Sequence, residues 1–403
     1  MAHDRLRQVN DLFSQLLQFS PITGIFGHRQ VGKSTYAASI SGIYRTLDDR
    51  DTLEAIAKSP KEFLLAKHKR PLVIDECQIE PDLFPALKEH VRTNKRPGQF
   101  ILTGSVRFTS RKAIRESLAG RISNIELYPL ILSEIMNEPL PEVLPLLLQA
   151  KAFTESSLGL LKPPARLAQT QKYLEKYLLH GGLPGLCFIR KNRLRTEGLT
   201  GLHQLILDRD LRMVTETKLS IETLMKWLRL IAANGWNSYN ASEVKRALGL
   251  AHQTQKNLLF GLESIFLIRR IPIKGRAGEI ILLEDQFEEL VLSEGKLSRS
   301  EQVLSAIYRN VRAQFQYRLG DTARFESYWT RSGARVPLVI QNETGLLGLN
   351  IVNEGKPNLS QMRAAESFLR HEPKGKVIFV SDTPIRPRIV EPRIMVCAAA
   401  AIV

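Results

Sequence analysis

The segment at residues 27–34 constrains this chain more than any other part of its sequence. It reads G-H-R-Q-V-G-K-S and fits the pattern G-x-x-x-x-G-K-[ST], between an apolar stretch at residues 22–26 and a helix-forming stretch at 35–40. Glycines allow the backbone to curl, so that successive N–H groups point at phosphate oxygens while the following helix adds its positive end. The pattern therefore predicts a phosphate-binding loop between a buried strand and a helix.

Several residues of this loop have an expected role in nucleotide binding. Lys33 is expected to reach the β- and γ-phosphates of ATP, and the Ser34 hydroxyl is expected to ligate Mg²⁺. An ordinary strand–turn–helix corner is the alternative. The predicted nucleotide-binding residues are Gly27, His28, Arg29, Gln30, Val31, Gly32, Lys33, Ser34 and Thr35.

Around this loop the sequence alternates between strand-like and helical patterns. An amphipathic helix is expected at residues 4–18, and helical stretches separate the apolar runs that follow. Such alternation predicts an α/β fold in which helices cover both faces of a parallel sheet. The predicted strands are at residues 22–26, 43–47, 72–75, 99–103 and 122–127.

Beyond residue 129 the pattern changes twice. Prolines interrupt a helical connector, helical periodicity continues to about residue 266, and short apolar runs return after residue 276. The later predicted strands are at residues 280–283, 336–340, 346–352 and 376–380, with helices near 300–314 and 360–369. A chain of 403 residues is long enough for two or three cores. We predict three parts, at residues 1–135, 136–275 and 276–403.

Two carboxylates, Asp75 and Glu76, end the predicted strand at residues 72–75. In a parallel sheet, ligands bind at the edge where the strands have their carboxyl ends, so both acids are expected beside the loop. Asp75 is expected to hold Mg²⁺ through water, and Glu76 to orient or deprotonate the attacking water. Solvated acids at the end of a strand are the alternative.

Two further features point to hydrolysis of the nucleotide. Thr103 or Ser105, at the end of the next strand, is expected to position the attacking water. Arg121 closes a predicted helix at residues 118–121. Its guanidinium, aimed at the γ-phosphate of a neighbouring subunit, would stabilise the transition state. A cation that only stabilises a helix C-terminus is the alternative role for Arg121.

Basic residues outnumber acidic ones, 57 to 41, which gives a net charge of +16. Between residues 143 and 275 the sequence has 20 Lys and Arg against nine Asp and Glu. Such a concentration of positive charge favours a polyanionic partner such as nucleic acid. A basic protein without such a partner has the same composition.

The remaining composition points to a cytoplasmic protein. Its three cysteines are scattered, which fits a reducing compartment. The first residues lack the apolar run of a signal peptide, and the apolar stretch at 394–403 is too short for a bilayer. We expect this last stretch to be a terminal strand or a docked tail.

Motifs in the first third of the chain resemble one family of proteins. Residues 27–35, 44–49, 73–78, 100–105 and 118–121 have the order and spacing found in AAA-type ATPases whose C-terminal half is a domain of unknown function numbered 4143. The resemblance continues through residues 127–134, Gly181-Gly182-Leu183-Pro184 and Asp208-Arg209-Asp210, and it weakens beyond about residue 275. It implies an ATPase core, a helical region with a winged-helix-like unit, and a C-terminal fold similar to PD-(D/E)XK nucleases.

The winged-helix-like unit has a definite place in the sequence. Two helices are expected at residues 240–250 and 252–266, with a wing at 267–274. Such a unit either places its second helix in a groove of nucleic acid or serves only for packing or protein docking. Its basic residues would line one side: Lys245, Arg246, Lys256, Arg269, Arg270 and Lys274.

The third part departs from the nuclease pattern that the resemblance implies. The acidic pair of that pattern falls on Arg335-Val336-Pro337, and its E-x-K motif falls on Asn350-Ile351-Val352. Glu301 matches a family acid, but it cannot make a metal site alone. We therefore expect a degenerate domain without nuclease chemistry, although Glu343 and Glu354 would be the acids of a rearranged site.

Together these patterns predict an ATP-hydrolysing enzyme that uses Mg²⁺ and engages nucleic acid. It is expected to form a homo-oligomer, in a ring or another assembly, in which Arg121 completes each site. The alternative is a slow nucleotide-gated switch or scaffold whose C-terminal domains bind a protein partner.

Overall fold

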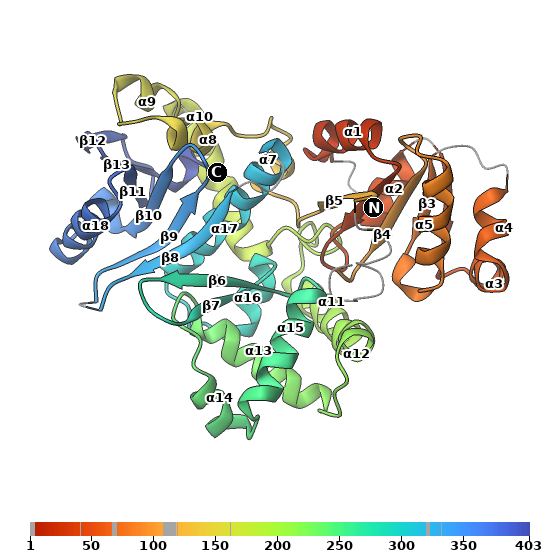
Figure 1. The fold of residues 1–403 in the computed structure, drawn as a ribbon. Helices are drawn as coiled ribbons and strands as arrows, with labels where there is room; N and C mark the ends of the chain where they lie inside the picture. The colour runs from red at the N-terminus through yellow and green to blue at the C-terminus, as the bar shows by residue number, and fades with distance from the viewer. Residues whose placement is uncertain are drawn as a thin grey trace.

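The computed structural model of the chain contains two sheets with helices around and between them (Figure 1). It describes residues 5–40, 42–66, 71–107, 118, 120–161, 163–319, 323–331 and 333–403. Within these ranges, no helix has the length and apolar character that crossing a bilayer requires.

The first sheet contains five strands in the order β2-β3-β4-β1-β5. Every neighbouring pair is parallel, which confirms the predicted α/β fold with a parallel sheet. Strand β4, which carries Thr103, lies between the strand that leads into the loop and the strand that ends at Asp75. The five strands are β1 (Ile22–Phe26), β2 (Ile43–Thr46), β3 (Leu72–Asp75), β4 (Phe100–Gly104) and β5 (Ile122–Glu126).

Helices cover both faces of this sheet because alternate side chains of a strand point to opposite faces. Val73 and Ile101 pack in one hydrophobic cluster with residues of α1 and α2. Their neighbours Leu72 and Leu102 pack in another cluster, with residues of α3, α4 and α5. These helices are α1 (Asn10–Phe19), α2 (Lys33–Ser39), α3 (Arg50–Lys58), α4 (Pro60–Leu65) and α5 (Leu83–Thr93).

Helices fill the middle of the chain, as its periodicity predicts. A π-helical turn, Ile206–Asp210, connects α11 to α12. Gly249 ends α14 in the left-handed conformation (φ 70°), which glycine adopts without strain. The helices are α7 (Leu132–Met136), α8 (Val143–Gln149), α9 (Glu155–Gly159), α10 (Pro164–His180), α11 (Asn192–Leu205), α12 (Leu211–Val214), α13 (Ile221–Asn234), α14 (Ala241–Leu248) and α15 (His252–Ser264).

The second sheet contains eight strands in the order β12-β13-β11-β10-β9-β8-β6-β7. Strands β6 and β7 form a hairpin, and β6 also pairs with β8. The predicted boundary at residue 275 therefore falls in the turn of a hairpin that belongs to this sheet. The strands are β6 (Ile268–Lys274), β7 (Glu279–Leu283), β8 (Arg324–Trp329), β9 (Arg335–Gln341), β10 (Leu346–Val352), β11 (Gly375–Ser381), β12 (Arg388–Glu391) and β13 (Ile394–Ala398).

Two helices pack on opposite faces of the second sheet. Helix α17 (Arg299–Leu319) shares a cluster with Leu338 and Leu347, whereas α18 (Leu359–His371) shares one with Val339 and Val377. The short helix α16 (Gln286–Leu292) precedes α17. The predicted terminal strand is β13, and the residues after it, to Val403, are buried in the same cluster as α17.

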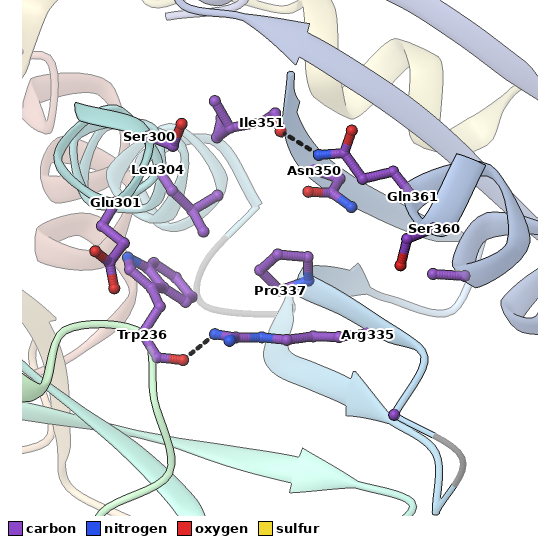
Figure 2. A pocket seen from close by; sticks show the side chains of 12 residues that line it. Trp236, Ser300, Glu301, Leu304, Arg335, Pro337, Asn350, Ile351, Ser360 and Gln361 are labelled. Carbon is purple, nitrogen blue, oxygen red and sulfur yellow. Dashed lines mark hydrogen bonds between the residues drawn. The ribbon is translucent and has the colours of Figure 1, made fainter. Parts of the chain in front are cut away.

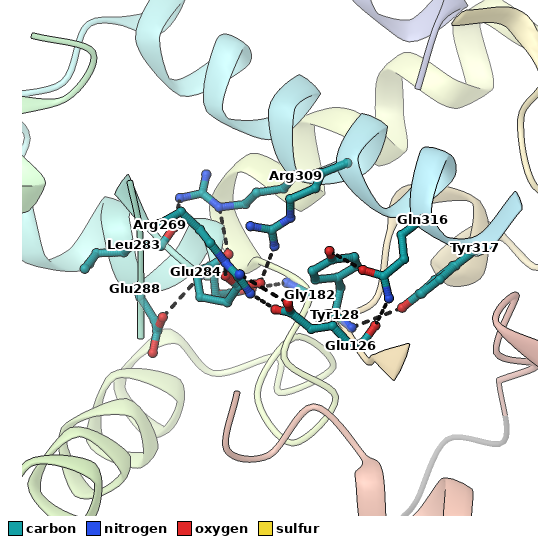
Figure 3. A network of polar contacts seen from close by, with 12 residues as sticks. Glu126, Tyr128, Gly182, Arg269, Leu283, Glu284, Glu288, Arg309, Gln316 and Tyr317 are labelled. Carbon is teal, nitrogen blue, oxygen red and sulfur yellow. Dashed lines mark hydrogen bonds and ion pairs between the residues drawn. The ribbon is translucent and has the colours of Figure 1, made fainter. Parts of the chain in front are cut away.

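The three parts of the chain share buried contacts around the loop. One hydrophobic cluster contains Val31 of the loop together with Leu207 and Phe287. Helix α17 also binds the end of β5, where the Gln316 side chain donates to the Glu126 carbonyl oxygen (2.7 Å) (Figure 3). The loop therefore lies where the parallel sheet meets the rest of the molecule.

Candidate nucleotide-binding site

The loop at residues 27–34 follows β1 at the carboxyl edge of the first sheet, as predicted. Gly32 adopts a left-handed conformation (φ 93°) just before α2 begins. A Cβ atom on Gly27 would lie 2.2 Å from the Leu127 carbonyl oxygen, so only glycine fits there. Gln30 is also left-handed (φ 63°), which is uncommon for a residue with a side chain. The backbone thus makes the curl that the glycine pattern predicts.

The Lys33 ammonium folds back into this curl. Its Nζ donates to the carbonyl oxygens of Gly27 (3.1 Å) and His28 (2.9 Å), and the side chain is buried. Burial lowers the pKa of Lys33, and the carboxylates of Glu76 and Asp75 act in the opposite direction. The cation is therefore held inside the loop, between its carbonyl oxygens and two acids.

Asp75 accepts hydrogen bonds from two hydroxyl groups on neighbouring strands. Tyr44 on β2 donates to Oδ2, and Thr103 on β4 donates to Oδ1. Ser34 lies close enough to the Tyr44 hydroxyl to act on the pKa of that phenol, in the direction that lowers it. Burial, followed by the effect of Asp75, raises the pKa of Tyr44, so the phenol keeps its proton. Tyr44 thus lies close to both Ser34 and Asp75, the two predicted Mg²⁺ ligands.

The oxygen atoms of Ser34 and Asp75 suit a magnesium ion. Mg²⁺ prefers oxygen donors and usually takes only one or two groups from a protein, with the rest from water and phosphate. The described residues contain no cluster of three or more His, Cys, Asp or Glu side chains that would hold a metal alone. A metal at this position would therefore depend on a bound nucleotide for its other ligands.

Glu76 directly follows Asp75, in a strained backbone conformation. Its dihedrals (φ 54°, ψ 39°) are left-handed, which costs about 1 kcal/mol or more for a residue other than glycine. Its carboxylate accepts a hydrogen bond from the Gln78 amide, and that amide lies 3.4 Å from the Ser105 hydroxyl. Of the two hydroxyls predicted to position water, Thr103 is therefore bonded to Asp75, whereas Ser105 belongs to the group around Glu76.

Two side chains of the loop form ion pairs with the middle and C-terminal parts of the chain. Arg29 pairs with Asp210 of the π-helical turn at 2.9 Å. His28 Nε2 lies 3.2 Å from the Glu288 carboxylate on α16, and His203 Nε2 on α11 lies 3.1 Å from the same oxygen. All of these side chains are buried except Arg29, which is 15% exposed.

The ionisation of His28 and Glu288 reflects this arrangement. Burial opposes a charge on His28, but the Glu288 carboxylate outweighs that effect, so the pKa of His28 is raised above 6.5. Burial likewise opposes a charge on Glu288, yet His28 and His203 lower its pKa. Both groups are stabilised in their charged forms because they face each other in a medium of low polarity.

Arg7 also stabilises the loop. Its guanidinium donates to the carbonyl oxygens of Val31 (2.8 Å) and Tyr128 (2.7 Å) and pairs with Glu134 (3.0 Å). The helix predicted at residues 4–18 therefore starts later, at Asn10, because Arg7 lies in a segment without regular structure that contacts the loop.

Sequence reasoning gave no role to several residues that contact the loop and its acids. A charged cluster, Asp208-Arg209-Asp210, was a visible signal for one of them, but nothing in the sequence indicates its partner. Most of the others lie far along the chain from the groups that they contact, whereas Gln78 is only two residues from Glu76. They are Arg7, Tyr44, Gln78, His203, Asp210 and Glu288.

Arg121 lies at the opposite edge of the sheet from the loop. It directly precedes β5, and the first residue of β5 pairs with Ile22, the first residue of β1. The loop follows the last residue of β1, so the two are separated by the length of the strand, about 16 Å. The structure therefore does not bring Arg121 together with the other predicted site residues of the same chain.

The basic residues of the predicted winged-helix-like unit fall into two groups. Lys245, Arg246 and Lys256 are exposed on α14 and α15. Arg269 is buried and paired with Glu126 and Glu284 (Figure 3). The prediction that all six line one side is therefore wrong for Arg269, because its guanidinium is buried between two carboxylates. The other two paired cations are Arg270, with Glu279, and Lys274, with Glu372.

The C-terminal residues that depart from the nuclease pattern lie together in space. Glu301, Arg335, Pro337 and Asn350 line one cavity in the second sheet. The acids Glu343 and Glu354 are exposed and do not line it.

Comparison with known proteins gives matches in two regions of the chain. Residues 20–136 match the family model of an AAA domain, and residues 171–276 match a domain of unknown function, DUF8612. The sequence resemblance implied the domain of unknown function 4143 for the second region, and the match to DUF8612 does not support that assignment. The resemblance there rested on two short motifs, which are too few to separate one helical family from another.

Two curated relatives and several solved structures are similar to this chain. Uncharacterized proteins of Mycobacterium tuberculosis (Rv2008c) and Mycobacterium bovis (Mb2031c) are each 23% identical over 257 residues, which is 63% of this chain and 50% of theirs. The chain thus spans about half the length of the curated relatives it matches.

Among solved structures, a DNA replication initiation factor is 13% identical and AMPPCP-bound DnaA from Aquifex aeolicus is 16% identical. Each match covers 64% of this chain and 91% of the other, with a TM-score of 0.24. Residues 20–136 are similar to AAA domains, and this region contains the curled loop of residues 27–34.

Proposed function

We propose that this chain binds ATP with Mg²⁺ at the loop of residues 27–34 and hydrolyses it. The observation that carries the proposal is that the Tyr44 hydroxyl, hydrogen-bonded to Asp75, is also influenced by Ser34, while the buried ammonium of Lys33 lies in the same loop. A hydroxyl, a carboxylate and a cation at the N-terminus of a helix are the groups that a metal-bound triphosphate requires. The match of residues 20–136 to AAA domains also supports ATP binding and hydrolysis.

Each residue of the site has a role in this proposal. Ser34 and Asp75 would hold Mg²⁺, which neutralises charge on the β- and γ-phosphates when bound. Lys33 would exchange its two carbonyl partners for phosphate oxygens. Glu76 would take a proton from the attacking water, and Gln78 would keep its carboxylate oriented.

The proposal extends to a homo-oligomer, in a ring or another assembly. Arg121 lies about a strand length from the loop of its own chain. Its guanidinium would therefore act on the γ-phosphate bound by a neighbouring subunit.

Engagement of nucleic acid is the second element of the proposal. It is supported by the exposed cations Lys245, Arg246 and Lys256 on two successive helices. Cations of this kind contact phosphates rather than bases, so binding would depend on salt and little on sequence.

The test is the rate of ATP hydrolysis by the full chain with and without DNA or RNA, over a range of salt concentrations. We expect Mg²⁺-dependent hydrolysis that nucleic acid stimulates at low salt and that loses this stimulation as salt rises. The variant Lys33→Ala controls for contaminating ATPases. Hydrolysis that is equal in Lys33→Ala would overturn the assignment of the site.

A slow nucleotide-gated switch that binds a protein partner is the second candidate. The ion pairs of Arg29 with Asp210 and of His28 with Glu288 favour it, since they link the loop directly to the other two parts of the chain. A slow hydrolysis rate that neither nucleic acid nor salt changes would support the switch over the first candidate.

A further inference from the structure

A cavity of about 390 Å³ lies in the C-terminal part of the chain, between α17, β9, β10 and α18 (Figure 2). Its size falls in the range of sites for small molecules. Its polar groups come from separate elements: Glu301 from α17, Arg335 from β9 and Asn350 from β10. None of the residues that line it belongs to the nucleotide site.

Arg335 brings a positive charge with unused hydrogen-bonding capacity into this cavity. One guanidinium nitrogen donates to the Trp236 carbonyl oxygen, whereas the buried Nε has no partner. Burial lowers the pKa of Arg335 to about 10, against the attraction of Glu301, so the side chain stays charged at neutral pH. A planar guanidinium in this state suits a carboxylate, which accepts two parallel hydrogen bonds from it.

Glu301 brings a negative charge to the same cavity. Its Oε2 accepts hydrogen bonds from the backbone N–H (3.0 Å) and hydroxyl (2.7 Å) of Ser298, which fix the carboxylate and leave Oε1 available. Figure 2 shows this carboxylate and the Arg335 guanidinium on different sides of Trp236. In the described structure the two charges influence each other but do not form an ion pair.

Asn350 adds an amide with free hydrogen-bonding groups. The residue is 8% exposed, and its side chain faces the cavity (Figure 2). It makes no hydrogen bond with the described part of the chain, although the neighbouring Gln361 amide donates to the Ile351 carbonyl oxygen (2.8 Å). The amide is therefore available to a polar ligand in the cavity.

The two opposite charges narrow the class of ligand. A metal ion is disfavoured by the Arg335 cation and by the single carboxylate, and a polyanion such as nucleic acid is disfavoured by Glu301. A small molecule that carries both charges satisfies the two groups at once. We infer that this cavity binds a free α-amino acid, with its carboxylate on Arg335, its ammonium on Glu301, and a hydrogen bond from Asn350.

The first test uses the full chain, without ATP, and measures binding of each of the common L-amino acids by thermal shift and calorimetry. The tightest binder is then compared with its N-acetyl derivative, which lacks the ammonium, and with its amide, which lacks the carboxylate. We expect each derivative to bind about tenfold to a hundredfold more weakly, as loss of one charged hydrogen bond implies. No binding by any amino acid, or binding of both derivatives as tight as that of the free amino acid, would overturn the inference.

Two variants locate the binding in this cavity. Asn350→Ala removes a side chain without partners, so it should keep the melting temperature and weaken the amino acid about tenfold. Glu301→Gln should lose the preference for the free amino acid over its N-acetyl derivative. Arg370→Met, at an exposed position on α18 outside the cavity, is the control. Unchanged affinity in both cavity variants would place the ligand elsewhere and refute the site. Because amino acid binding is measured without ATP, a negative result does not contradict the proposed ATPase activity.

Discussion

One guanidinium nitrogen of Arg29 bonds both carboxylate oxygens of Asp210, at 2.9 and 3.0 Å. Arg29 belongs to the loop of residues 27–34, and Asp210 ends a π-helical turn 181 residues later in the chain. Turns of this type are rare and often lie at functional sites. The pair therefore connects the proposed nucleotide site to the helices in the middle of the chain.

We expect Asp210→Ala to destabilise the protein by about 3 kcal/mol, because removing one partner leaves the largely buried Arg29 charge unpaired. Unfolding in urea measures this change. The control is Glu197→Ala, which breaks the exposed pair of Glu197 with Arg193 and should change stability by less than about 1 kcal/mol. Similar losses of stability in the two variants would mean that the buried Arg29 pair stabilises the protein no more than the exposed pair.

Lys33→Ala should weaken ATP binding by about 100-fold, since the loop loses the cation that its backbone surrounds. Glu76→Gln should bind ATP normally but hydrolyse it about 100-fold more slowly or worse, since an amide cannot act as a base. Calorimetry and single-turnover kinetics separate the two effects. Unchanged turnover in Glu76→Gln would contradict the role assigned to this carboxylate.

Tyr44→Phe should raise the Mg²⁺ concentration that ATP binding requires, because it removes the hydroxyl that donates to Asp75. We expect about a tenfold higher Mg²⁺ requirement, the value of one hydrogen bond to a charged group. Binding of ATP in the presence of EDTA should stay the same. Tyr173→Phe, far from the loop, serves as the matched control, and equal behaviour of the two variants would argue against this role of Tyr44.

Stability should fall as pH rises above about 6.5, because the pKa of His28 is higher in the folded protein than in the unfolded chain. The contribution of His28 is complete below its unfolded pKa and is lost as pH rises through the raised pKa. The lowered pKa of Glu288 acts only in acid, as pH falls below about 4.5.

Melting temperatures between pH 6 and 8.5 measure this slope. His28→Gln should flatten it, whereas His252→Gln, at an exposed position on α15, should leave it unchanged. A slope that persists in His28→Gln would assign the pH dependence to other groups.

Arg121→Ala should reduce hydrolysis more than ATP binding, because the proposed contact forms with a neighbouring subunit in the transition state. Mixing Arg121→Ala with Lys33→Ala should then restore part of the activity. In a mixed oligomer, the intact nucleotide site of an Arg121→Ala subunit can receive Arg121 from a neighbouring Lys33→Ala subunit. Equal loss of binding and hydrolysis, with no recovery on mixing, would give Arg121 a structural role only.

Local patterns were sufficient to predict the parallel sheet and the curl of the loop that follows its first strand. The strands of the first sheet lie within one residue of their predicted bounds. Apolar runs between polar turns define the buried strands β1, β3 and β4. The strands β8 and β12, with exposed or half-exposed residues, carried no such pattern and were not predicted. The start of α1 was also misplaced, because the contacts of Arg7 with the loop override local periodicity.

The sequence by itself determined the curl at residues 27–34, the strands around it and the acids at their ends, since glycine conformations and alternating burial act over a few residues. Only the tertiary structure decided what that loop contacts. The pairs Arg29–Asp210 and His28–Glu288 join residues more than 180 positions apart, and the cavity that Arg335 shares with Glu301 exists only because a helix and a strand pack together. Such contacts arise from the packing of whole elements, and no local pattern encodes them.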